Sequence, residues 1–362
     1  MSKTKKFGLE SRDVEEYLPW GGIIRPGVMR QKDNSYFSII EYKPYEVYDN
    51  KLLDTKKWDW RRGWVIWNEH QHVPDNEGKD FLVICWNPFH STTGKVINTL
   101  DRVISMQKET AYFEKKVKDF LKEFSTVTEV NMLEYQALMD VLTFSLNFGE
   151  KQVGMPDVPL YIDALLAGSI QLRTTENNVY INNKELFIIS INGGMDEAKI
   201  YPMLKNISFR HSKRLLCFNK KQAAKQIAKY TKTWFPKRMT IRNMAMDNII
   251  SNFNGYYTES LLFLLDEENA SDFKKYAISL LHANGIAFII ESHNLKSVLW
   301  GTIPGLFLAN TKPPIQGFSS MTEFLHGKVK KQKENIDILE EATNRKIVTP
   351  VDVTEYIMKG EV

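Results

Sequence analysis

The sequence predicts an α+β (mixed α/β) fold, with two α/β subdomains whose antiparallel or mixed sheets are flanked by helices. Short apolar runs with the two-residue alternation of strands occur in both halves of the 362-residue chain. Apolar residues from Leu100 to Phe124 instead recur at spacings of three and four, which is one face of a helix. Residues 149–159 lie between the halves and hold two glycines and two prolines, so we expect the boundary there.

The chain divides into four predicted regions. Residues 1–15 are a polar N-terminal arm, and residues 16–150 are the first α/β subdomain, which contains the long helix 100–124. Residues 160–325 are the second α/β subdomain, and residues 326–362 are a charged, partly helical C-terminal tail. The length fits two domains of about 150 residues each, and the composition, 43% hydrophobic and 25% charged, is that of a globular protein.

The first subdomain contains two clear strand patterns and two helix patterns. Residues 36–42 alternate with the period of a strand, and the continuous apolar run 81–86 is typical of a buried central strand. Four tryptophans lie within residues 54–69, a stretch that we expect to be helical or irregular. Residues 130–148 predict a second helix, antiparallel to helix 100–124.

The second subdomain begins again with helices and strands in alternation. Helices are expected at 160–168, 196–204, 219–235 and 272–283, and Pro236 ends the third of them. Strands are expected at 179–181 and 185–191, which form a hairpin around Asn182-Asn183, and at 215–218, 261–265 and 286–290.

The strongest compositional signal is a basic block. Residues 199–242 contain 13 Lys or Arg and no Asp or Glu, while the remaining 35 basic residues are set against all 44 acidic residues. On the predicted helix 219–235 four lysines form one stripe, because they are spaced four, four and three apart. Such a stripe is either a solvated helix face or a docking surface for something acidic.

The residues that we assign to this basic face for partner or membrane docking are Lys213, Arg214, Lys220, Lys221, Lys225, Lys229, Lys232, Lys237 and Arg238. Anionic lipid headgroups, an acidic protein patch and nucleic-acid phosphates would all fit its charge. Aromatic residues interleaved with the lysines would favour nucleic acid, through base stacking. Tyr230 and Trp234 fall on the apolar side of the helix instead, so nucleic acid is the less favoured partner.

We find no motif that carries catalysis, and we expect no catalytic residue, no cofactor and no metal. A P-loop requires GxxxxGK[ST], and the nearest segment, residues 91–96, lacks the first glycine and the hydroxyl. His70, His72, Cys85 and His90 lie within 21 residues but match no zinc spacing. Residues 266–268 are an acidic cluster that is more typical of a solvated loop than of a catalytic site. We therefore expect that the chain is not an enzyme, and residues 266–268 are the first place to look otherwise.

Two short motifs about 280 residues apart identify a resemblance. The first is Leu18-Pro-Trp-Gly-Gly-Ile-Ile-Arg-Pro-Gly-Val28, followed by Lys32-Asp33-Asn34-Ser35. The second is Val298-Leu-Trp-Gly-Thr-Ile-Pro-Gly305, followed by Gly317-Phe-Ser-Ser-Met321. Together they resemble the N-terminal domain of the VirB4/TrbE/CagE family of conjugation and type IV secretion ATPases. The matching structural positions are Leu18, Pro19, Trp20, Pro26, Gly27, Trp300, Pro304 and Gly305.

The chain departs from the family pattern in two ways. Asn34 stands where the family usually has glycine, and asparagine can replace glycine in a left-handed turn. The sequence also contains no Walker A motif, and only 37 residues follow Leu325. The resemblance therefore implies the N-terminal module of such an ATPase without its motor, and no catalytic residue is carried over.

The resemblance implies a structural or assembly role in a type IV secretion or conjugative DNA-transfer machine. In the family this region packs on the membrane side and contacts inner-membrane and channel subunits. We expect the same partners here, together with a separate ATPase domain, an oligomeric state and a peripheral membrane contact. The sequence lacks an apolar signal segment, so the expected location is the cytoplasm, at the cytoplasmic face of the inner membrane. The alternative is a nucleic-acid-binding protein of a mobile element that uses the basic face 199–242.

Overall fold

The computed structural model describes most of the chain between residues 7 and 325. The described residues are 7–9, 14–15, 17–43, 63–74, 76–88, 99–126, 128–155, 161–175, 178–192, 194–218, 253–292, 295–306, 315–318 and 324–325. The predicted helix 219–235 and the predicted tail 326–362 lie outside them.

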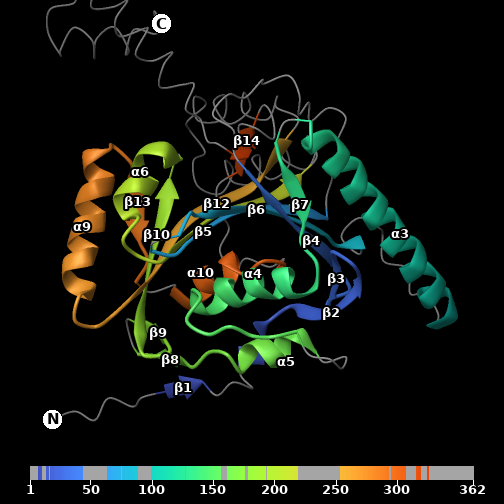
Figure 1. Cartoon of the computed structure of the whole chain (residues 1–362), viewed down its shortest axis with the longest axis horizontal. Coiled ribbons are helices and arrows are strands. Elements are labelled where there is room, and N and C mark those ends of the chain that lie inside the picture. The colour runs from blue at the N-terminus through green and yellow to red at the C-terminus, as the bar shows by residue number, and fades with distance from the viewer. Residues whose placement is uncertain are drawn as a thin grey trace, which may run out of the picture.

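One sheet of 14 strands organises the described residues, and its ladders are antiparallel (Figure 1). Its path is β1-β8-β9-β10-β12-β11-β5-β6-β4-β3-β2, with β13 beside β10, β14 beside β12 and β7 beside β4. The strands are β1 Phe7–Leu9, β2 Trp20–Arg25, β3 Val28–Gln31, β4 Tyr36–Tyr42, β5 Trp64–His72, β6 Lys79–Trp86, β7 Val130–Met132, β8 Leu172–Thr174, β9 Val179–Ile181, β10 Lys184–Asn192, β11 Phe209–Phe218, β12 Phe253–Leu265, β13 Ala287–Ile290 and β14 Ile315–Phe318.

Helices pack on both faces of this sheet (Figure 1). They are α3 Thr99–Phe124, α4 Tyr135–Asn147, α5 Ile162–Ala167, α6 Glu197–Leu204, α9 Ala270–Ala283 and α10 Leu295–Thr302. Helices α4, α5 and α10 share one buried cluster with alternate residues of the central strands. Helix α3 packs on the opposite face, as do α6 and α9 further along the sheet. The α+β class that the sequence predicts is confirmed.

The two sequence halves meet in the middle of the sheet. Strand β5 from the first half pairs with β11 from the second, with Val65 opposite Leu216 and His72 opposite Phe209. At the start of the chain, β1 pairs with β8, so residues 7–9 of the expected polar arm join the sheet. The boundary at residues 149–159 stays a prediction; the strands on its two sides form one sheet.

Several elements confirm the sequence pattern. The structure contains the predicted strands 36–42 and 81–86, the helix 100–124 and the hairpin around Asn182-Asn183. Both asparagines have positive φ, of 50° and 70°, as a tight hairpin turn requires. Asn34 also has a positive φ, of 66°, so it does take the left-handed conformation for which the family uses glycine.

Two predicted elements are wrong. The tryptophan-rich stretch was expected to be helical or irregular, but residues 64–72 form strand β5, buried along its whole length. The predicted helix 130–148 begins only at Tyr135, because residues 130–132 form β7 against β4. In both segments the strand is specified by its neighbours across the sheet, which local periodicity does not encode.

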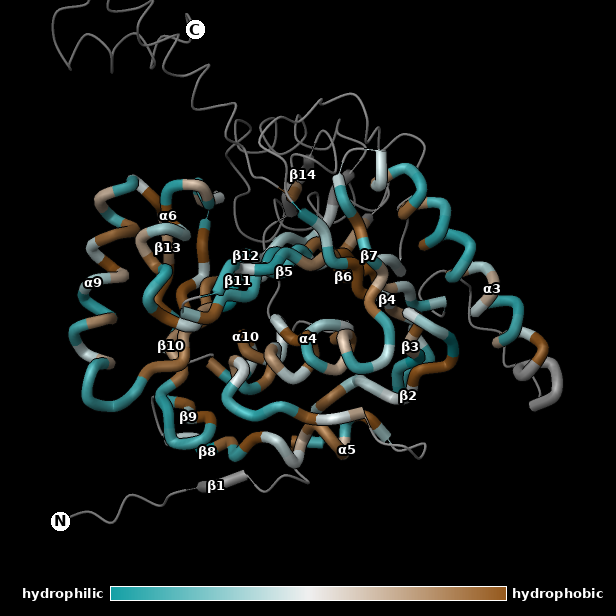
Figure 2. The backbone as a smooth tube through the Cα atoms, viewed as in Figure 1, coloured by the Kyte–Doolittle hydropathy of each residue, from teal (hydrophilic) through white to brown (hydrophobic). Residues whose placement is uncertain are grey.

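A hydrophilic band crosses the centre of the sheet where β5, β11 and β12 lie side by side (Figure 2). Its buried polar members are Asn68, Glu69, His70, Gln71, Arg210, His211, Ser212, Lys213, Arg214, Glu259 and Ser260. Buried polar groups are costly unless they are paired, so this band requires partners from other elements.

Candidate functional site

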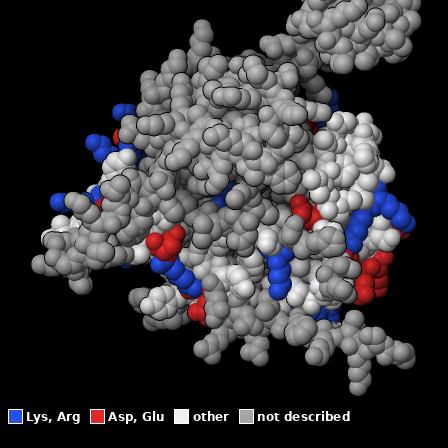
Figure 3. Space-filling model, turned by 180° about the vertical axis from the view of Figure 1, so that it is seen from behind, with Lys and Arg blue, Asp and Glu red and all other residues white. Residues whose placement is uncertain are grey.

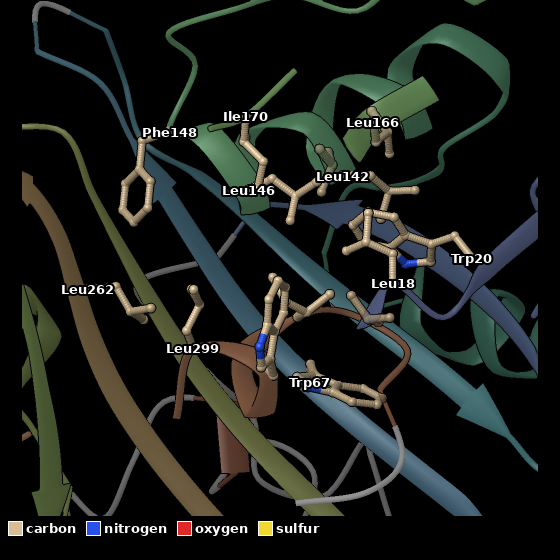
Figure 4. Packing of buried hydrophobic residues seen from close by; sticks show 14 of the residues in the cluster. Leu18, Trp20, Trp67, Leu142, Leu146, Phe148, Leu166, Ile170, Leu262 and Leu299 are labelled. Carbon is tan, nitrogen blue, oxygen red and sulfur yellow. The ribbon is translucent and has the colours of Figure 1, made fainter. Parts of the chain in front are cut away.

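The two sequence motifs meet at one place in the fold. The indole N–H of Trp20 donates a hydrogen bond to the carbonyl oxygen of Pro304, at 2.8 Å and across 284 residues of sequence. The ring of Tyr17 stacks on that of Trp300, with centroids 5.1 Å apart and planes 6° from parallel. Figure 4 shows Leu18 and Trp20 close to Leu142 of α4 and Leu166 of α5. We call this contact between residues 17–20 and residues 300–305 the motif junction.

The turns of the first motif bring Trp20 into the core. Trp20 is fully buried and begins β2, which turns at Pro26-Gly27 into β3. Gly27 has φ of 69°, and a side chain there would also overlap Met132. The backbone N–H of Lys32 donates to the Pro19 carbonyl at 2.9 Å, so the chain before β2 is tied to the chain after β3.

Gly305 gives the second motif its close approach to the first. Its φ is 93°, a conformation that non-glycine residues rarely adopt. A Cβ at this position would overlap the side-chain amide nitrogen of Gln31, and the Trp20 indole nitrogen would lie 3.6 Å away. The glycine is therefore required by the contact between the motifs as well as by its own backbone angle.

Two buried arginines of β11 hold the end of helix α10 on the sheet. The guanidinium of Arg210 donates to the carbonyl of Thr302 at 3.0 Å, and that of Arg214 donates to the carbonyl of Gly301 at 3.1 Å. The last carbonyls of a helix have no partner within the helix, and cationic donors there are favourable. These two bonds and the Trp20 bond together fasten residues 301–304 to strands β11 and β2.

Arg210 also forms a fully buried ion pair. Its Nε donates to Glu69 Oε1 at 2.5 Å, and both side chains have no exposed surface. Its remaining donor reaches the carbonyl of Ser145 in α4 at 2.6 Å. One guanidinium therefore joins β5, β11, α4 and α10. Burial lowers the pKa of the neighbouring Arg214 to about 10, and its guanidinium lies 5.2 Å from the ring of Trp67.

A second polar cluster lies on the opposite face of the same strands. Glu259 of β12 accepts from Tyr257 at 2.7 Å and lies 3.1 Å from His211. Lys213 pairs with Glu197 of α6 and donates to the Leu325 carbonyl at 2.8 Å. Burial alone would raise the pKa of Glu259, but the hydrogen bond from His211 and the charges of His211 and Lys213 outweigh it, so this pKa is lowered.

The predicted docking face divides into two groups. Lys213 and Arg214 are 1% and 4% exposed, so they are internal anchors and do not contribute to an exposed face. The other seven residues, from Lys220 to Arg238, lie outside the described residues and stay a prediction. Three cations of the basic block, Lys199, Arg210 and Lys213, pair with acids that come from outside it. On the face seen in Figure 3, described basic and acidic side chains occur in several separate places.

The candidate metal ligands are separated in the fold. His70 lies 3.1 Å from Asp80, whereas His72 lies 2.8 Å from the carbonyl of Lys205. Cys85 is buried, and burial raises the pKa of its thiol well above the usual value. His90 lies outside the described residues. Within the part of the chain that the structure describes, no three His, Cys, Asp or Glu side chains are grouped to hold a metal ion.

The acidic cluster 266–268 follows strand β12 on an exposed turn. Asp266 is 3.2 Å from Lys184, which also pairs with Glu150 at 3.0 Å. Asp266 lines a pocket of about 490 Å³ between the ends of β10 and β12 and helices α6 and α9, with Phe148 and Phe273 among its apolar walls. In this arrangement the carboxylate of Asp266 serves an ion pair at the pocket rim.

The sequence pattern did not identify the residues that hold the motif junction together. Arg210 and Glu69 are 141 residues apart, and each looks like an ordinary polar residue in a strand. One available signal is that Arg210 and Arg214 lie four apart in β11, which puts both on the same face of the strand. Helix α10, which carries the second motif, was also not predicted.

Comparison with known proteins gives similar sequences from conjugation systems. No protein-family model matches the chain. The chain is 21% identical over 222 residues to a probable conjugal transfer protein TrbE, in its second segment, of Sinorhizobium fredii, and the match covers 53% of this chain and 33% of that protein. It is 20% identical over 222 residues to a conjugal transfer protein TrbE of Rhizobium radiobacter, and that match covers 53% of this chain and 26% of that protein. The matches thus span about a third and a quarter of these relatives.

Crossing a bilayer requires a helix of about 20 predominantly apolar residues. None of the described helices combines that length with that apolar character.

Proposed function

We propose that this chain is a VirB4-like N-terminal module, a non-catalytic assembly component of a conjugative DNA-transfer or type IV secretion machine. The observation that carries the proposal is the motif junction. The two segments that resemble the family are 284 residues apart at Trp20 and Pro304, yet they bind one another directly. The similarity to TrbE conjugal transfer proteins supports the same class of machine.

The geometry at the motif junction favours a structural role. The indole N–H, both guanidinium groups and the helix carbonyls that meet there are used in internal hydrogen bonds. A catalytic site needs a nucleophile, base or electrophile that can reach a substrate. The junction instead sets the position of one end of the domain relative to the other. In our proposal the motor activity belongs to a separate ATPase domain, and this module connects it to the inner membrane.

The proposed partners are inner-membrane and channel subunits, reached from the cytoplasmic face. The docking surface would be the basic residues Lys220, Lys221, Lys225, Lys229, Lys232, Lys237 and Arg238. A cationic surface of this kind is attracted to anionic headgroups, by about 1 kcal/mol for each Lys or Arg near the surface, and to acidic protein patches.

A charge-reversal variant tests this surface. The triple change Lys221→Glu, Lys225→Glu and Lys229→Glu should abolish membrane recruitment and co-purification with channel subunits, and should lower the frequency of DNA transfer. The matched control reverses the same number of charges on the exposed side of α3, at Lys108, Lys115 and Lys122, and should behave as wild type.

Three results would contradict the proposal. Loss of DNA retention with a steep salt dependence, while recruitment to membrane and channel subunits is unchanged, would establish the nucleic-acid alternative. ATP hydrolysis by the purified chain, lost on changing residues of this chain, would show that it is an enzyme. Recruitment that survives the triple change would remove the basic stripe from the docking surface.

A further inference from the structure

Strand β13 is an exposed apolar edge of the sheet. Its four residues, Ala287–Ile290, pair with β10 and with no other described strand. Ile289 and Ile290 are 54% and 41% exposed, and Ala287 is exposed as well. An edge strand presents a row of unpaired N–H and C=O groups that can pair with another strand. This edge does so with two of the most exposed isoleucines in the described chain.

The ladder fixes which backbone groups point outward. The N–H of Glu291 donates to the carbonyl of Ile188 in β10, at 3.0 Å. Backbone groups alternate in direction along a strand, so those of residue 289 point to β10 while those of residues 288 and 290 point to the open edge. Two N–H and two C=O groups of β13 are therefore available to a further strand.

The usual protections of an edge strand are missing at β13. Natural edges carry a lysine or proline, a bulge, or an inward-pointing charge. Residues 286–290 contain none of these side chains. The neighbouring Glu291 is held on β10, where it accepts from the Ser190 hydroxyl at 2.6 Å. The opposite edge of the sheet differs, because β2 has two register irregularities against β3 that disrupt it.

Strand β13 is complementary to itself. In an antiparallel pair of two β13 strands centred on Ile289, residue 288 of one copy lies opposite residue 290 of the other, which places all the outward backbone groups in hydrogen-bonded pairs. Ile289 then packs against Ile289 on one face of the sheet. On the other face Phe288 packs against Ile290, because both share the face of Ile189 and Ile191. Every apolar side chain meets another, and no like charges are brought together.

We propose that two copies of this chain associate through β13 and form one continuous sheet across a two-fold axis. A two-fold contact uses the same patch on both copies, which the self-complementary register satisfies. Two four-residue strands bury little surface, so the dimer is weak and depends on protein concentration, with a dissociation constant roughly micromolar or higher. The inference rests on β13 and β10 alone and does not depend on the proposed function.

Sedimentation of the full chain tests the association. The wild type should show a reversible, concentration-dependent doubling of mass up to about 100 μM, as expected for a weak complex. Ile289→Lys should remain a folded monomer, because it places two lysines opposite one another while altering an exposed side chain. Ile104→Lys, at a residue of α3 with 46% exposure, is the matched control and should dimerise as the wild type does.

A disulfide cross-link tests the register. In the proposed pairing the two Ile289 residues form a non-hydrogen-bonded pair, whose Cβ atoms lie about 4.5–5.5 Å apart, near the range of a disulfide. Ile289→Cys should therefore form a disulfide-linked dimer under mild oxidation, and Ile104→Cys should not. The native Cys85 and Cys217 are buried and should not interfere.

Three outcomes would overturn the proposal. The first is a wild-type chain that stays monomeric over the whole concentration range. The second is a dimer that persists unchanged in Ile289→Lys, which would place the interface elsewhere. The third is equal cross-linking of Ile289→Cys and Ile104→Cys. Folding of each variant is checked by its thermal unfolding, and Ile289→Thr replaces Ile289→Lys if the lysine variant does not fold.

Discussion

The contact between Trp20 and Pro304 can be measured by comparing two tryptophans. Trp20 and Trp67 are both fully buried in the same core cluster. The indole N–H of Trp20 donates to the Pro304 carbonyl, whereas that of Trp67 has no hydrogen-bond partner among the described residues. Changing each to phenylalanine removes the same atoms from the same core, but only Trp20→Phe breaks a hydrogen bond.

The expected difference follows from the cost of an unsatisfied buried group. Both variants lose similar volume and leave a similar small cavity, so this component of the cost is common to them. Trp20→Phe also leaves the buried Pro304 carbonyl without its donor, which costs about 1–3 kcal/mol. Trp67→Phe removes a donor that was already unpaired. We therefore expect Trp20→Phe to be less stable than Trp67→Phe by about 1–3 kcal/mol.

The assay is equilibrium unfolding in urea, with the slope against denaturant compared among the wild type and both variants. Equal slopes are needed for the difference in midpoints to report on stability. A Trp67→Phe variant that is as unstable as Trp20→Phe would refute the reasoning, since the hydrogen bond would then contribute nothing. A larger loss in Trp67→Phe would show that its contact with Arg214 outweighs the bond that closes the motif junction.

Three further predictions concern the other buried groups. Arg210→Met leaves the buried Glu69 carboxylate unpaired and should cost about 3–5 kcal/mol, and the double variant with Glu69→Met should recover some of that loss. Gly305→Ala should lose more than about 1 kcal/mol, because it combines a positive φ with an overlap, whereas Gly22→Ala, with no atom near its Cβ, should be almost neutral. The lowered pKa of Glu259 means that its ionised form is favoured in the folded state. It therefore contributes stability above its usual pKa of 4.5 that is lost as the pH falls through the lower folded value. Glu259→Gln should flatten that region of the pH profile of unfolding.

Each of these predictions has a result that would contradict it. A double variant at Arg210 and Glu69 as unstable as Arg210→Met alone would mean that the unpaired carboxylate is not the source of the cost. Equal effects of alanine at the two glycines would place the strain elsewhere. An acid profile unchanged by Glu259→Gln would show that other carboxylates control unfolding below pH 4.5.

The hydrophobic patterns were sufficient where a segment faces one environment along its length. Helix α3 and strands β4 and β6 follow from the spacing of their apolar residues, because that spacing is a local property. Strand β5 was missed for a physical reason. Its second half, from Asn68 to His72, is polar and buried, and its side chains are satisfied by residues far away in sequence, as Asn68 and Gln71 show. No local pattern distinguishes a polar strand of that kind from a loop.

The assignment of basic residues shows the same limit. The block 199–242 was expected to lie on a surface because its charges have no acidic neighbours in sequence. Lys213 and Arg214 are buried instead, and the acid that pairs with Lys213 comes from helix α6 just before the block. Charge balance inside a protein is reached in three dimensions, so a run of one sign does not by itself define an exposed face.

By itself, the sequence determined the α+β class, the main helices and strands, the turns that need Asn34 or Gly27, and the two motifs that resemble conjugation ATPases. Each of these depends on short-range spacing or on the φ of a single residue. Only the tertiary structure decided that the motifs bind one another through Trp20 and Pro304, and that Arg210 and Glu69 support them from within the sheet. Those contacts join residues from 141 to 284 positions apart, and only the fold brings such residues within hydrogen-bond distance.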